Sequence, residues 1–207
     1  ACLVGSEMCI RDSAYAEQVR DDSETSFELR LRGERVGRVS LAMAGTHNIA
    51  NALAAAAAAD ALGVDPAVMA PALSAFGGLR RRFEFVPDGD VTFVDDYAHH
   101  PHAIAVTLAT ARRRFPGRRL VAVFQATLFT RLHRFLEPFS QSFDAADAVV
   151  IVETQPSRER DTGLVHGRDL VAKIAARPDF AAGSARVYYG GTYDETAALL
   201  RALRRPG

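Results

Sequence analysis

The sequence DDYAHHP at residues 95–101 joins a short apolar run, VTFV at residues 91–94, to a helical pattern that opens at Pro101. The apolar run predicts a strand, and the proline favours a helix start because its fixed φ suits the first helical position. One strand-to-helix turn therefore carries two carboxylates, a tyrosine and two imidazoles: Asp95, Asp96, Tyr97, His99 and His100. Any one of them could serve only a helix end or local packing. All of them on one turn indicate a ligand site, because such turns are where open α/β sheets bind ligands.

Beyond this turn, apolar strands alternate with helical patterns to the end of the chain. The predicted strands are 91–94, 120–124, 148–152 and 187–189, and the predicted helices are 101–115, 132–145, 167–176 and 193–203. Continuous apolar strands between helices predict a parallel sheet that is buried on both faces. The fold class is therefore α/β, with a Rossmann-like, mostly parallel sheet and helices on both of its faces.

Polar residues also follow the next two predicted strands. QATLFTR at 125–131 includes Arg131, and ETQPSRER at 153–160 includes Glu159. We expect all three polar groups on the same edge of the sheet, where carboxylates, imidazoles and arginines suit a phosphorylated or carboxylate substrate. A metal site is a weaker interpretation, because the side chains of the adjacent His99 and His100 need not converge.

The first part of the chain has a different pattern. A hairpin is predicted from 25–31 and 36–42, followed by an alanine-rich helix that ends at Gly63 and a second helix over 66–76. Asn48 and Asn51 are three residues apart and share the first turn of the alanine-rich helix. Their carboxamides could read an adenine edge, since each has a donor and an acceptor. Capping and a surface asparagine are an equally good explanation.

A domain boundary is predicted near Gly77-Gly78 and the arginines at 80–82. Adjacent arginines are usually solvated, but at a domain junction they could face phosphates. We therefore expect one domain over 14–82 and a second over 83–207. Residues 1–13 (ACLVGSEMCIRDS) show no helical or strand period, and we interpret them as a non-native tail. A second basic run, at 112–114 and 118–119, falls at a helix C-terminus and in the following turn, where cations complement the helix dipole, and we interpret it as structural.

Composition excludes several kinds of partner. Lys+Arg and Asp+Glu each number 25, so no net charge draws the chain to nucleic acid or to an anionic membrane. Apolar residues make up 48% of the chain, which is typical of a globular protein. No apolar run reaches the roughly 20 residues of a membrane span. Both cysteines lie within the first ten residues, which suits a reducing cytoplasm.

Four motifs in this order resemble the muramyl ligases, the ATP-dependent amide ligases of peptidoglycan synthesis. They are GTHNIANALAAAAAADALG, GGLRRRFE, VDDYAHHPHAI and FQ followed by TR, and the resemblance covers residues 25–207. DDYAHHP together with FQ is most similar to the members that join L-alanine to UDP-N-acetylmuramate through an acyl phosphate. The members that join recycled murein tripeptide to UDP-N-acetylmuramate share AHHP but have Phe where Tyr97 stands, and they are the alternative.

The resemblance implies a longer enzyme with a central ATPase domain that contains a P-loop. This chain has no such loop, so it resembles the last strands and helices of the central ATPase domain, followed by a C-terminal domain truncated at its end. ATP and Mg²⁺ are implied for the full-length enzyme, with the metal ligands outside these residues, and the fragment alone is expected to be inactive. A free-standing nucleotide-binding module and a metal-dependent hydrolase that uses His99 and His100 remain alternatives.

The resemblance also implies roles for particular residues. His47, Asn48 and Asn51 match an adenine-side motif, and Arg82 matches an arginine that reaches the nucleotide phosphates. Asp95 or, preferably, Asp96 matches the acid that meets the ribose. His99, His100 and Arg131 match the part that holds the muramoyl carboxylate and the incoming amino acid, with Tyr97 on the same substrate-binding turn. Residues 126–129 (ATLF) depart from the family pattern PHxY, often with arginine where Leu128 stands, and Glu159 receives no role.

Overall fold

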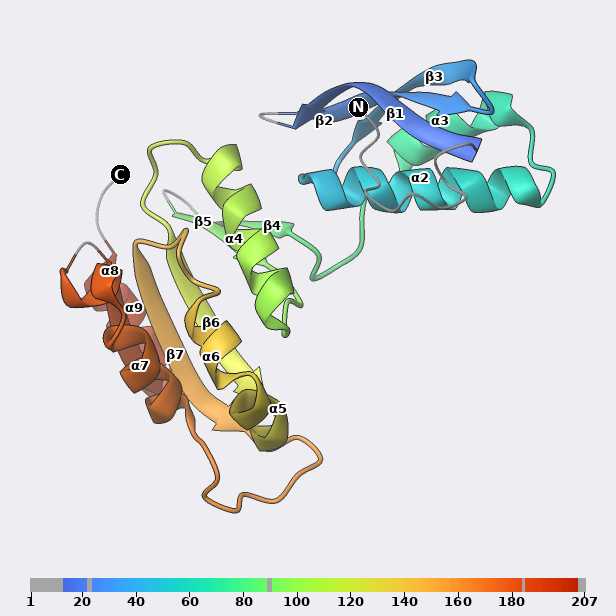
Figure 1. The fold of residues 1–207 in the computed structure, drawn as a ribbon. Helices are drawn as coiled ribbons and strands as arrows, with labels where there is room; N and C mark the ends of the chain where they lie inside the picture. Colours follow the sequence, from blue (N-terminus) through green and yellow to red (C-terminus); the bar gives the residue numbers. More distant parts are fainter. Residues whose placement is uncertain (1–12, 22–23, 89–90, 184, 205–207) are drawn as a thin grey trace. The chain divides into compact units, whose positions relative to one another are not determined.

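The computed structural model describes residues 13–21, 24–88, 91–183 and 185–204 (Figure 1). The chain divides into two compact units, Ala1–Asp96 and Tyr97–Gly207. The predicted non-native tail falls almost wholly on residues 1–12, which lie outside the described residues. The predicted domain boundary after Arg82 remains a prediction.

The first unit contains an antiparallel sheet in the order β1-β2-β3. Its strands are β1 (Ala14–Asp21), β2 (Thr25–Leu31) and β3 (Glu34–Leu41). The pairing of β2 with β3 confirms the predicted hairpin, with Leu31 opposite Glu34. β1 was not predicted from the sequence, because its fully buried inward side chains are the alanines Ala14 and Ala16, which are weak β formers.

Two helices, α2 (Thr46–Ala61) and α3 (Pro66–Ala75), pack against this sheet. Positions 49, 52, 53 and 56 of α2 are buried, which is the spacing of one helix face. Gly63 has φ +78 just beyond α2 and ends it, as predicted, because glycine adopts this conformation without steric cost. The buried core of the unit is Ala14, Ala16, Phe27, Leu29, Leu31, Val39, Leu41, Ile49, Ala52, Leu53, Ala56, Met69 and Ala70.

A two-stranded antiparallel sheet of β4 (Glu84–Asp88) and β5 (Val91–Asp95) ends the first unit. The prediction that residues 91–94 form a strand is confirmed. The prediction that this strand joins the parallel sheet is wrong for the described residues. β5 pairs with β4 in full register, with Glu84 opposite Asp95, and Phe93 remains 47% exposed. A five-residue strand that follows a short turn can pair with the strand before that turn. Its apolar sequence alone does not show which strand it pairs with.

The second unit contains the predicted parallel sheet, in the order β6-β7-β8. Its strands are β6 (Val121–Thr127), β7 (Ala148–Gln155) and β8 (Arg186–Gly191). β7 pairs in parallel with both neighbours, and Ala148 lies opposite Val121 on one side and Arg186 on the other. Five successive buried residues of β7 explain why its sequence is continuously apolar.

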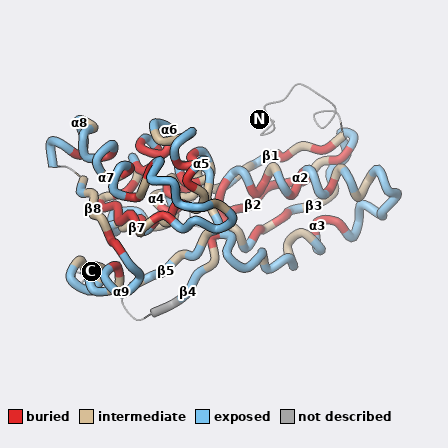
Figure 2. Tube along the Cα trace, turned by 90° about the horizontal axis from the view of Figure 1, so that it is seen from below, coloured by how far each residue is buried: buried red, intermediate tan, exposed pale blue. Residues whose placement is uncertain are grey.

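Helices cover both faces of this sheet, as predicted. The helices are α4 (Pro101–Arg114), α5 (Phe129–Arg134), α6 (Leu136–Ser140), α7 (Gly167–Ala175), α8 (Pro178–Ala181) and α9 (Tyr193–Leu203). Figure 2 shows α9 on the side of β7 and β8 opposite to α6, α7 and α8. Accordingly, Val149 and Ile151 join the main core cluster, whereas Val150 approaches Gly190 beside Thr196 of α9.

The helix predicted over 132–145 is instead two short helices, α5 and α6, joined at Phe135. Pro138 explains the break, because proline has no N–H and its ring clashes with the carbonyl four residues earlier, which is that of Arg134. The core that these helices help to form is Ile104, Leu108, Ala122, Phe124, Ala126, Phe129, Leu132, Phe139, Phe143, Ala146, Val149, Ile151, Val165, Leu170, Ile174 and Phe180.

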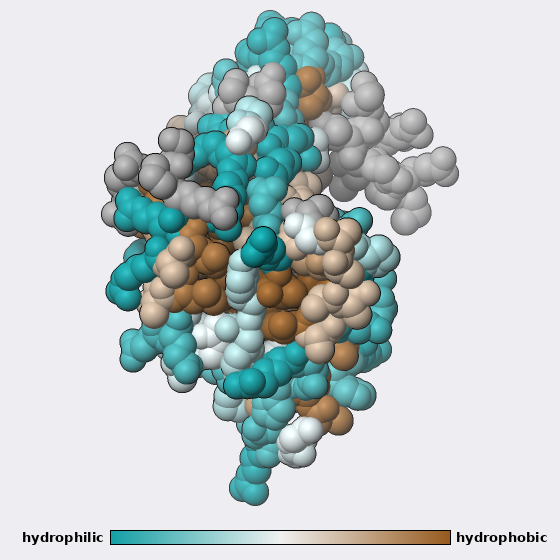
Figure 3. All heavy atoms as spheres, turned by 90° about the vertical axis from the view of Figure 1, so that its left-hand side faces the viewer, coloured by the Kyte–Doolittle hydropathy of each residue, from teal (hydrophilic) through white to brown (hydrophobic). Residues whose placement is uncertain are grey.

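β8 is the outermost strand on its side of the sheet within the described residues. Its side chains Val187, Tyr188 and Tyr189 are only half-buried. Figure 3 views the molecule from the side of α7, α8 and α9 and shows apolar residues gathered in the middle of this face, between hydrophilic side chains. No helix in the described part of the chain is long and apolar enough to cross a bilayer.

Candidate active site

The carboxyl ends of β6 and β7 bring two of the predicted polar groups together. Thr127 lies opposite Gln155 in the parallel register, and the Leu128 N–H donates to the Gln155 carbonyl at 3.1 Å. Segments 125–131 and 153–160 therefore lie side by side at one edge of the sheet, as the sequence predicted. This is the edge at which parallel α/β sheets bind ligands.

Leu128 and the first turn of α5, residues 129–131, form the loop that carries Arg131, and the backbone of this loop is strained at Leu128. Leu128 has φ +72 and ψ 116, a region that residues other than glycine rarely adopt. Phe129 is 3% exposed and Leu132 is fully buried, so apolar packing fixes the inner side of the loop. Strain of this kind persists where surrounding contacts enforce it, and it is frequent at functional sites.

Arg131 is half-buried in this loop. Its guanidinium forms neither a hydrogen bond nor an ion pair with any residue that the structure describes. Other arginines of the unit are engaged, since Arg112 binds Asp147 and Arg177 binds Asp144. Arg131 therefore has all its donors available for an anionic ligand, and a guanidinium can bind a carboxylate through two parallel hydrogen bonds.

Glu159 contacts the same loop from the neighbouring segment. Its carboxylate accepts hydrogen bonds from the Thr130 N–H at 3.0 Å and from the Thr130 hydroxyl. These bonds, first the one from the hydroxyl and then the one from the backbone, lower the pKa of Glu159, and the charge of Arg131 adds to the effect. Glu159 thus stays ionised around neutral pH.

Glu153, at the end of β7, is the centre of a second group of hydrogen bonds. It accepts from the Tyr189 hydroxyl, from the Thr154 N–H at 2.6 Å and from the Gly167 N–H at 3.4 Å. His166 Nδ1 lies 3.6 Å from its Oε1. Burial alone raises the pKa of Glu153, but the bonds from Tyr189, Thr154 and Gly167 outweigh burial and lower it. Glu153 belongs to the polar segment 153–160 predicted at this edge but received no role of its own, and Tyr189 was not predicted as a site residue, because a single tyrosine on a strand carries no motif.

Gln125, from the FQ motif, connects three elements at this edge. Its Nε2 donates to the Glu153 carbonyl at 3.1 Å, and its Oε1 accepts from the Tyr193 hydroxyl at 2.9 Å. Both ends of its side chain are therefore used within the protein. Arg168 lies over the Tyr189 ring, 4.2 Å from its centroid. The edge is thus a connected polar network on a buried sheet.

The first predicted polar group is divided between the two units. Tyr97, His99 and His100 belong to the second unit, whereas Asp95 and Asp96 belong to the first. The expectation that all three polar groups share the edge of one sheet is therefore wrong for this group, because β5 pairs outside the parallel sheet in the described residues. The roles predicted for these residues remain predictions.

Within the turn, the two imidazoles have different neighbours. His99 Nδ1 lies 2.9 Å from the Tyr97 carbonyl, and the two rings meet edge to face at 4.9 Å. His100 packs against Phe135 with ring centroids 5.2 Å apart. Their side chains do not converge on one point. Among the residues described, no group of three or more His, Cys, Asp and Glu is arranged to hold a metal ion.

In the first unit, the predicted adenine-side residues lie on the first turns of α2. His47 and Asn51 are exposed, but Asn48 is 9% exposed. The Asn48 Nδ2 donates to the Ala44 carbonyl at 2.8 Å, and its Oδ1 accepts from Asn51 Nδ2 at 3.3 Å. Asn48 is thus partly committed within the protein and orients Asn51, which is the more accessible carboxamide.

The arginine run and the two aspartates contact each other locally. Arg81 Nε lies 3.6 Å from Asp95 Oδ2, and Asp96 Oδ2 accepts from the Phe83 N–H at 2.9 Å. Arg82 is exposed. Within this run, Arg81 therefore faces an acid of the β4–β5 sheet.

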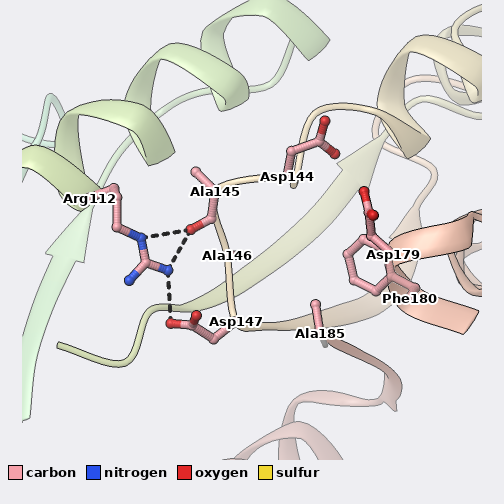
Figure 4. Close-up of a pocket in the computed structure, with 8 residues that line it drawn as sticks. All are labelled: Arg112, Asp144, Ala145, Ala146, Asp147, Asp179, Phe180 and Ala185. Atoms are coloured by element: carbon pink, nitrogen blue, oxygen red, sulfur yellow. Dashed lines mark hydrogen bonds and ion pairs between the residues drawn. The ribbon is translucent and has the colours of Figure 1, made fainter. Parts of the chain in front are cut away.

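A cavity of about 520 Å³ lies at the opposite, amino end of β7 and β8 (Figure 4). Its lining residues are Arg112, Asp144, Ala145, Ala146, Asp147, Asp179, Phe180 and Ala185. Arg112 donates to the Ala145 carbonyl at 2.7 and 3.1 Å and to Asp147 at 2.8 Å. These contacts confirm the structural role predicted for this part of the basic run.

The second unit is an α/β domain whose parallel sheet presents an ionised, partly strained polar network at its carboxyl edge. Residues 81–207 match the family model described as Mur ligase, glutamate ligase domain, and the chain belongs to this family. This finding confirms the resemblance on which the residue roles rest.

Individual relatives agree with the family. The chain is 41% identical over 199 residues to the UDP-N-acetylmuramate–L-alanine ligase of Nitratidesulfovibrio vulgaris, covering 95% of the chain and 43% of that protein. A solved UDP-N-acetylmuramate–alanine ligase from Thermotoga maritima matches with a TM-score of 0.71 and 27% identity, over 90% of the chain and 39% of its own. A murein peptide ligase from Psychrobacter arcticus matches with a TM-score of 0.64 and 30% identity, over 94% of the chain and 39% of the ligase's own length. The chain thus spans less than half the length of these relatives.

Proposed function

We propose that the chain is part of an ATP-dependent ligase that joins L-alanine to UDP-N-acetylmuramate in peptidoglycan synthesis, in the cytoplasm. The observation that carries the proposal is Arg131, a half-buried guanidinium with no described ion-pair partner at the carboxyl edge of the parallel sheet. An arginine in this setting suits the carboxylate of an amino acid. The relatives named as alanine ligases support the choice of amino acid.

The proposed reaction has two steps. The substrate carboxylate attacks the γ-phosphorus of ATP, which releases ADP and forms an acyl phosphate. The alanine amine then attacks the acyl carbon and expels phosphate, so that an amide bond replaces the C–O bond and one proton is lost from nitrogen. Both steps depend on aligning two reactants and on neutralising phosphate charge.

Residues of the second unit would orient the incoming amino acid and the substrate to which it is joined. We assign Arg131 to the carboxylate of the incoming amino acid, and His99, His100 and Tyr97 to the substrate that approaches the turn before α4. The contact of His99 with the Tyr97 carbonyl gives its imidazole a fixed orientation, which a residue that positions substrate needs. The bond from Gln125 to the Glu153 carbonyl joins the ends of β6 and β7.

Residues of the first unit would contact the nucleotide. We assign His47, Asn48 and Asn51 to the adenine side, Arg82 to the phosphates, and Asp96 or Asp95 to the ribose. Asn51, oriented by Asn48, has one N–H and its carbonyl oxygen left to pair with a base edge. The described residues offer no carboxylate cluster for Mg²⁺, so we propose that the metal ligands and the P-loop lie elsewhere in the full-length enzyme.

A murein tripeptide is the second candidate for the acceptor amine. The solved murein peptide ligase is 30% identical to the chain, slightly more than the solved alanine ligase at 27%. Loop residues 126–129 (ATLF) also depart from the pattern of the alanine-joining members, so this loop does not decide between the two. Tyr97, in place of the phenylalanine of the tripeptide ligases, favours L-alanine.

The experiment is to purify the full-length gene product and to supply UDP-N-acetylmuramate, ATP and Mg²⁺ with either L-alanine or the tripeptide. We expect phosphate release and amide product with L-alanine, and at least tenfold lower kcat/KM with the tripeptide. Preference for the tripeptide would reverse the assignment, and turnover with neither would refute it. Residues 1–207 alone should give no product, because this chain contains no P-loop to hold the β- and γ-phosphates.

A further inference from the structure

Two hydrogen bonds join the first turn of α5, which carries Arg131, to the segment that follows β7. Both are donated by Thr130, one from its backbone N–H at 3.0 Å and one from its hydroxyl, and both are accepted by the carboxylate of Glu159. Glu159 is the only ionised group that the described structure shows bonded to this loop. Thr130 immediately precedes Arg131, so its position sets the direction in which the guanidinium leaves the backbone.

The inner and outer sides of the loop are held by different forces. On the inner side, Phe129 and Leu132 are buried, and the Phe129 ring meets His166 edge to face with centroids 5.4 Å apart. On the outer side, Thr130 is exposed, and its bonds to Glu159 add to the helical bond from the Leu132 N–H to the Leu128 carbonyl at 3.1 Å. Removing Glu159 should therefore leave the fold intact while loosening the first turn of α5 on its outer side.

We propose that Glu159 is a positioning residue that fixes Arg131 for binding the carboxylate of the incoming amino acid. This inference rests on the proposed function. The strained φ of Leu128 makes such a restraint necessary, because the backbone would gain free energy by relaxing away from this conformation. A shift of about 1 Å in a group that orients a reactant can reduce the rate on the order of 10²-fold.

A direct role for Glu159 in binding the amine is less consistent with its contacts. Both of its carboxylate oxygens already accept hydrogen bonds from Thr130. These bonds, rather than burial, lower its pKa, so the carboxylate is a permanent acceptor and not a base around neutral pH. The geometry thus favours Glu159 as a residue that connects the segment after β7 to the first turn of α5, and not as a residue that exchanges protons with a ligand.

The test compares Glu159→Gln, Thr130→Val and the double variant in the full-length enzyme. Each single substitution should raise the KM for L-alanine about tenfold and leave the KM for ATP within about twofold. The double variant should be little worse than either single variant, because both substitutions weaken the bond of the Thr130 hydroxyl while the Thr130 N–H is kept in each. Thr130→Ser keeps both donors and should restore wild-type kinetics. Asp194→Asn, an exposed carboxylate-to-amide change on α9, is the matched control.

Amide hydrogen exchange of residues 129–131 separates the restraint from the proposed function. Glu159→Gln should speed this exchange about tenfold or more while the protection of β7 is unchanged. Unchanged exchange, additive kinetic effects, or an equal rise in the KM for ATP would each overturn the positioning role. If the wild-type enzyme does not use L-alanine, the proposed function fails and the assignment of Arg131 to an amino-acid carboxylate fails with it. The exchange result would still report whether Glu159 restrains the loop.

Discussion

The hydroxyl of Tyr189 on β8 donates a hydrogen bond to the carboxylate of Glu153 on β7. This contact joins the ends of adjacent parallel strands where their backbone register shifts, between Ile151 and Val152. The side-chain bond therefore connects the strands where the regular backbone ladder is interrupted. Glu153 also contacts the first turn of α7, because its carboxylate accepts a hydrogen bond from the Gly167 N–H.

Tyr189→Phe should destabilise the second unit by about 1 kcal/mol, the usual net worth of one hydrogen bond. The ring and its packing remain, so the loss reports the hydroxyl alone. Urea unfolding followed by circular dichroism measures the change. Tyr188→Phe is the matched control, because it removes a hydroxyl from the neighbouring position of β8. An equal loss in both variants would mean that the bond to Glu153 contributes nothing specific.

The Glu153 carboxylate should make stability depend on acid pH. Its hydrogen bonds lower its pKa in the folded protein below the ordinary value of 4.5, although burial opposes them. A carboxylate with a lowered folded-state pKa contributes stability that is complete above the unfolded value and is lost as the pH falls through the folded value. Glu153→Gln should therefore be less stable than wild type at pH 7 and lose less stability between pH 5 and pH 3. Parallel stability curves for the two proteins over that range would contradict this.

Arg82→Ala should impair catalysis by the full-length enzyme far more than Arg80→Ala. Only Arg82 matches the arginine proposed to reach the nucleotide phosphates. Loss of a charge-assisted contact to a transferring phosphoryl group commonly costs on the order of 10²-fold in kcat. Steady-state kinetics with saturating L-alanine measure both variants. Equal effects would show that the run is simply a solvated surface.

Arg131→Lys should raise the KM for the carboxylate substrate by about tenfold with little change in the KM for ATP, because lysine cannot form a bidentate pair with a carboxylate. Leu128→Arg should be tolerated or should lower this KM, since position 128 lies in the same loop. Substrate-saturation curves for L-alanine and for ATP measure both effects. Wild-type alanine kinetics with weakened ATP binding in Arg131→Lys would assign Arg131 to the nucleotide.

Gly190→Ala should destabilise the packing of α9 on the sheet by about 1–3 kcal/mol, the usual cost of overpacking. A Cβ at Gly190 would overlap the Thr196 hydroxyl and lie 3.0 Å from a Val150 methyl group. Thermal unfolding measures the loss. Gly77→Ala is the control, because a Cβ there meets nothing within 4 Å and its φ is ordinary. Similar melting temperatures for Gly190→Ala and wild type would show that α9 moves without cost.

Local patterns predicted the long elements well. The helix predicted over 193–203 coincides with α9, where Thr192 and Glu195 form a reciprocal cap. The parallel sheet followed from continuous apolar strands. Sequence patterns failed to predict which strand pairs with which. β5 pairs with β4, whose sequence EFVPD contains poor strand formers.

The sequence predicted which segments form the candidate site, but not the contacts between their side chains. The positions of 125–131 and 153–160 on one edge followed from topology alone. The contacts of Glu153 with Tyr189 and of Glu159 with Thr130 did not, because they depend on how far β6 and β7 extend beyond their apolar runs. The strain at Leu128 also left no trace in the sequence, since leucine does not signal a positive φ.

At position 128, the residue that favours stability of the fold differs from the residue that favours ligand binding. Leu128→Gly would remove the steric cost of φ +72, which favours the folded chain, and this gain is opposed by the larger conformational entropy that glycine loses on folding. The same change would let the loop sample other conformations and lose affinity for its ligand. Engineering for heat resistance and engineering for turnover should therefore choose different residues at position 128, which is a stability–activity trade-off confined to one residue.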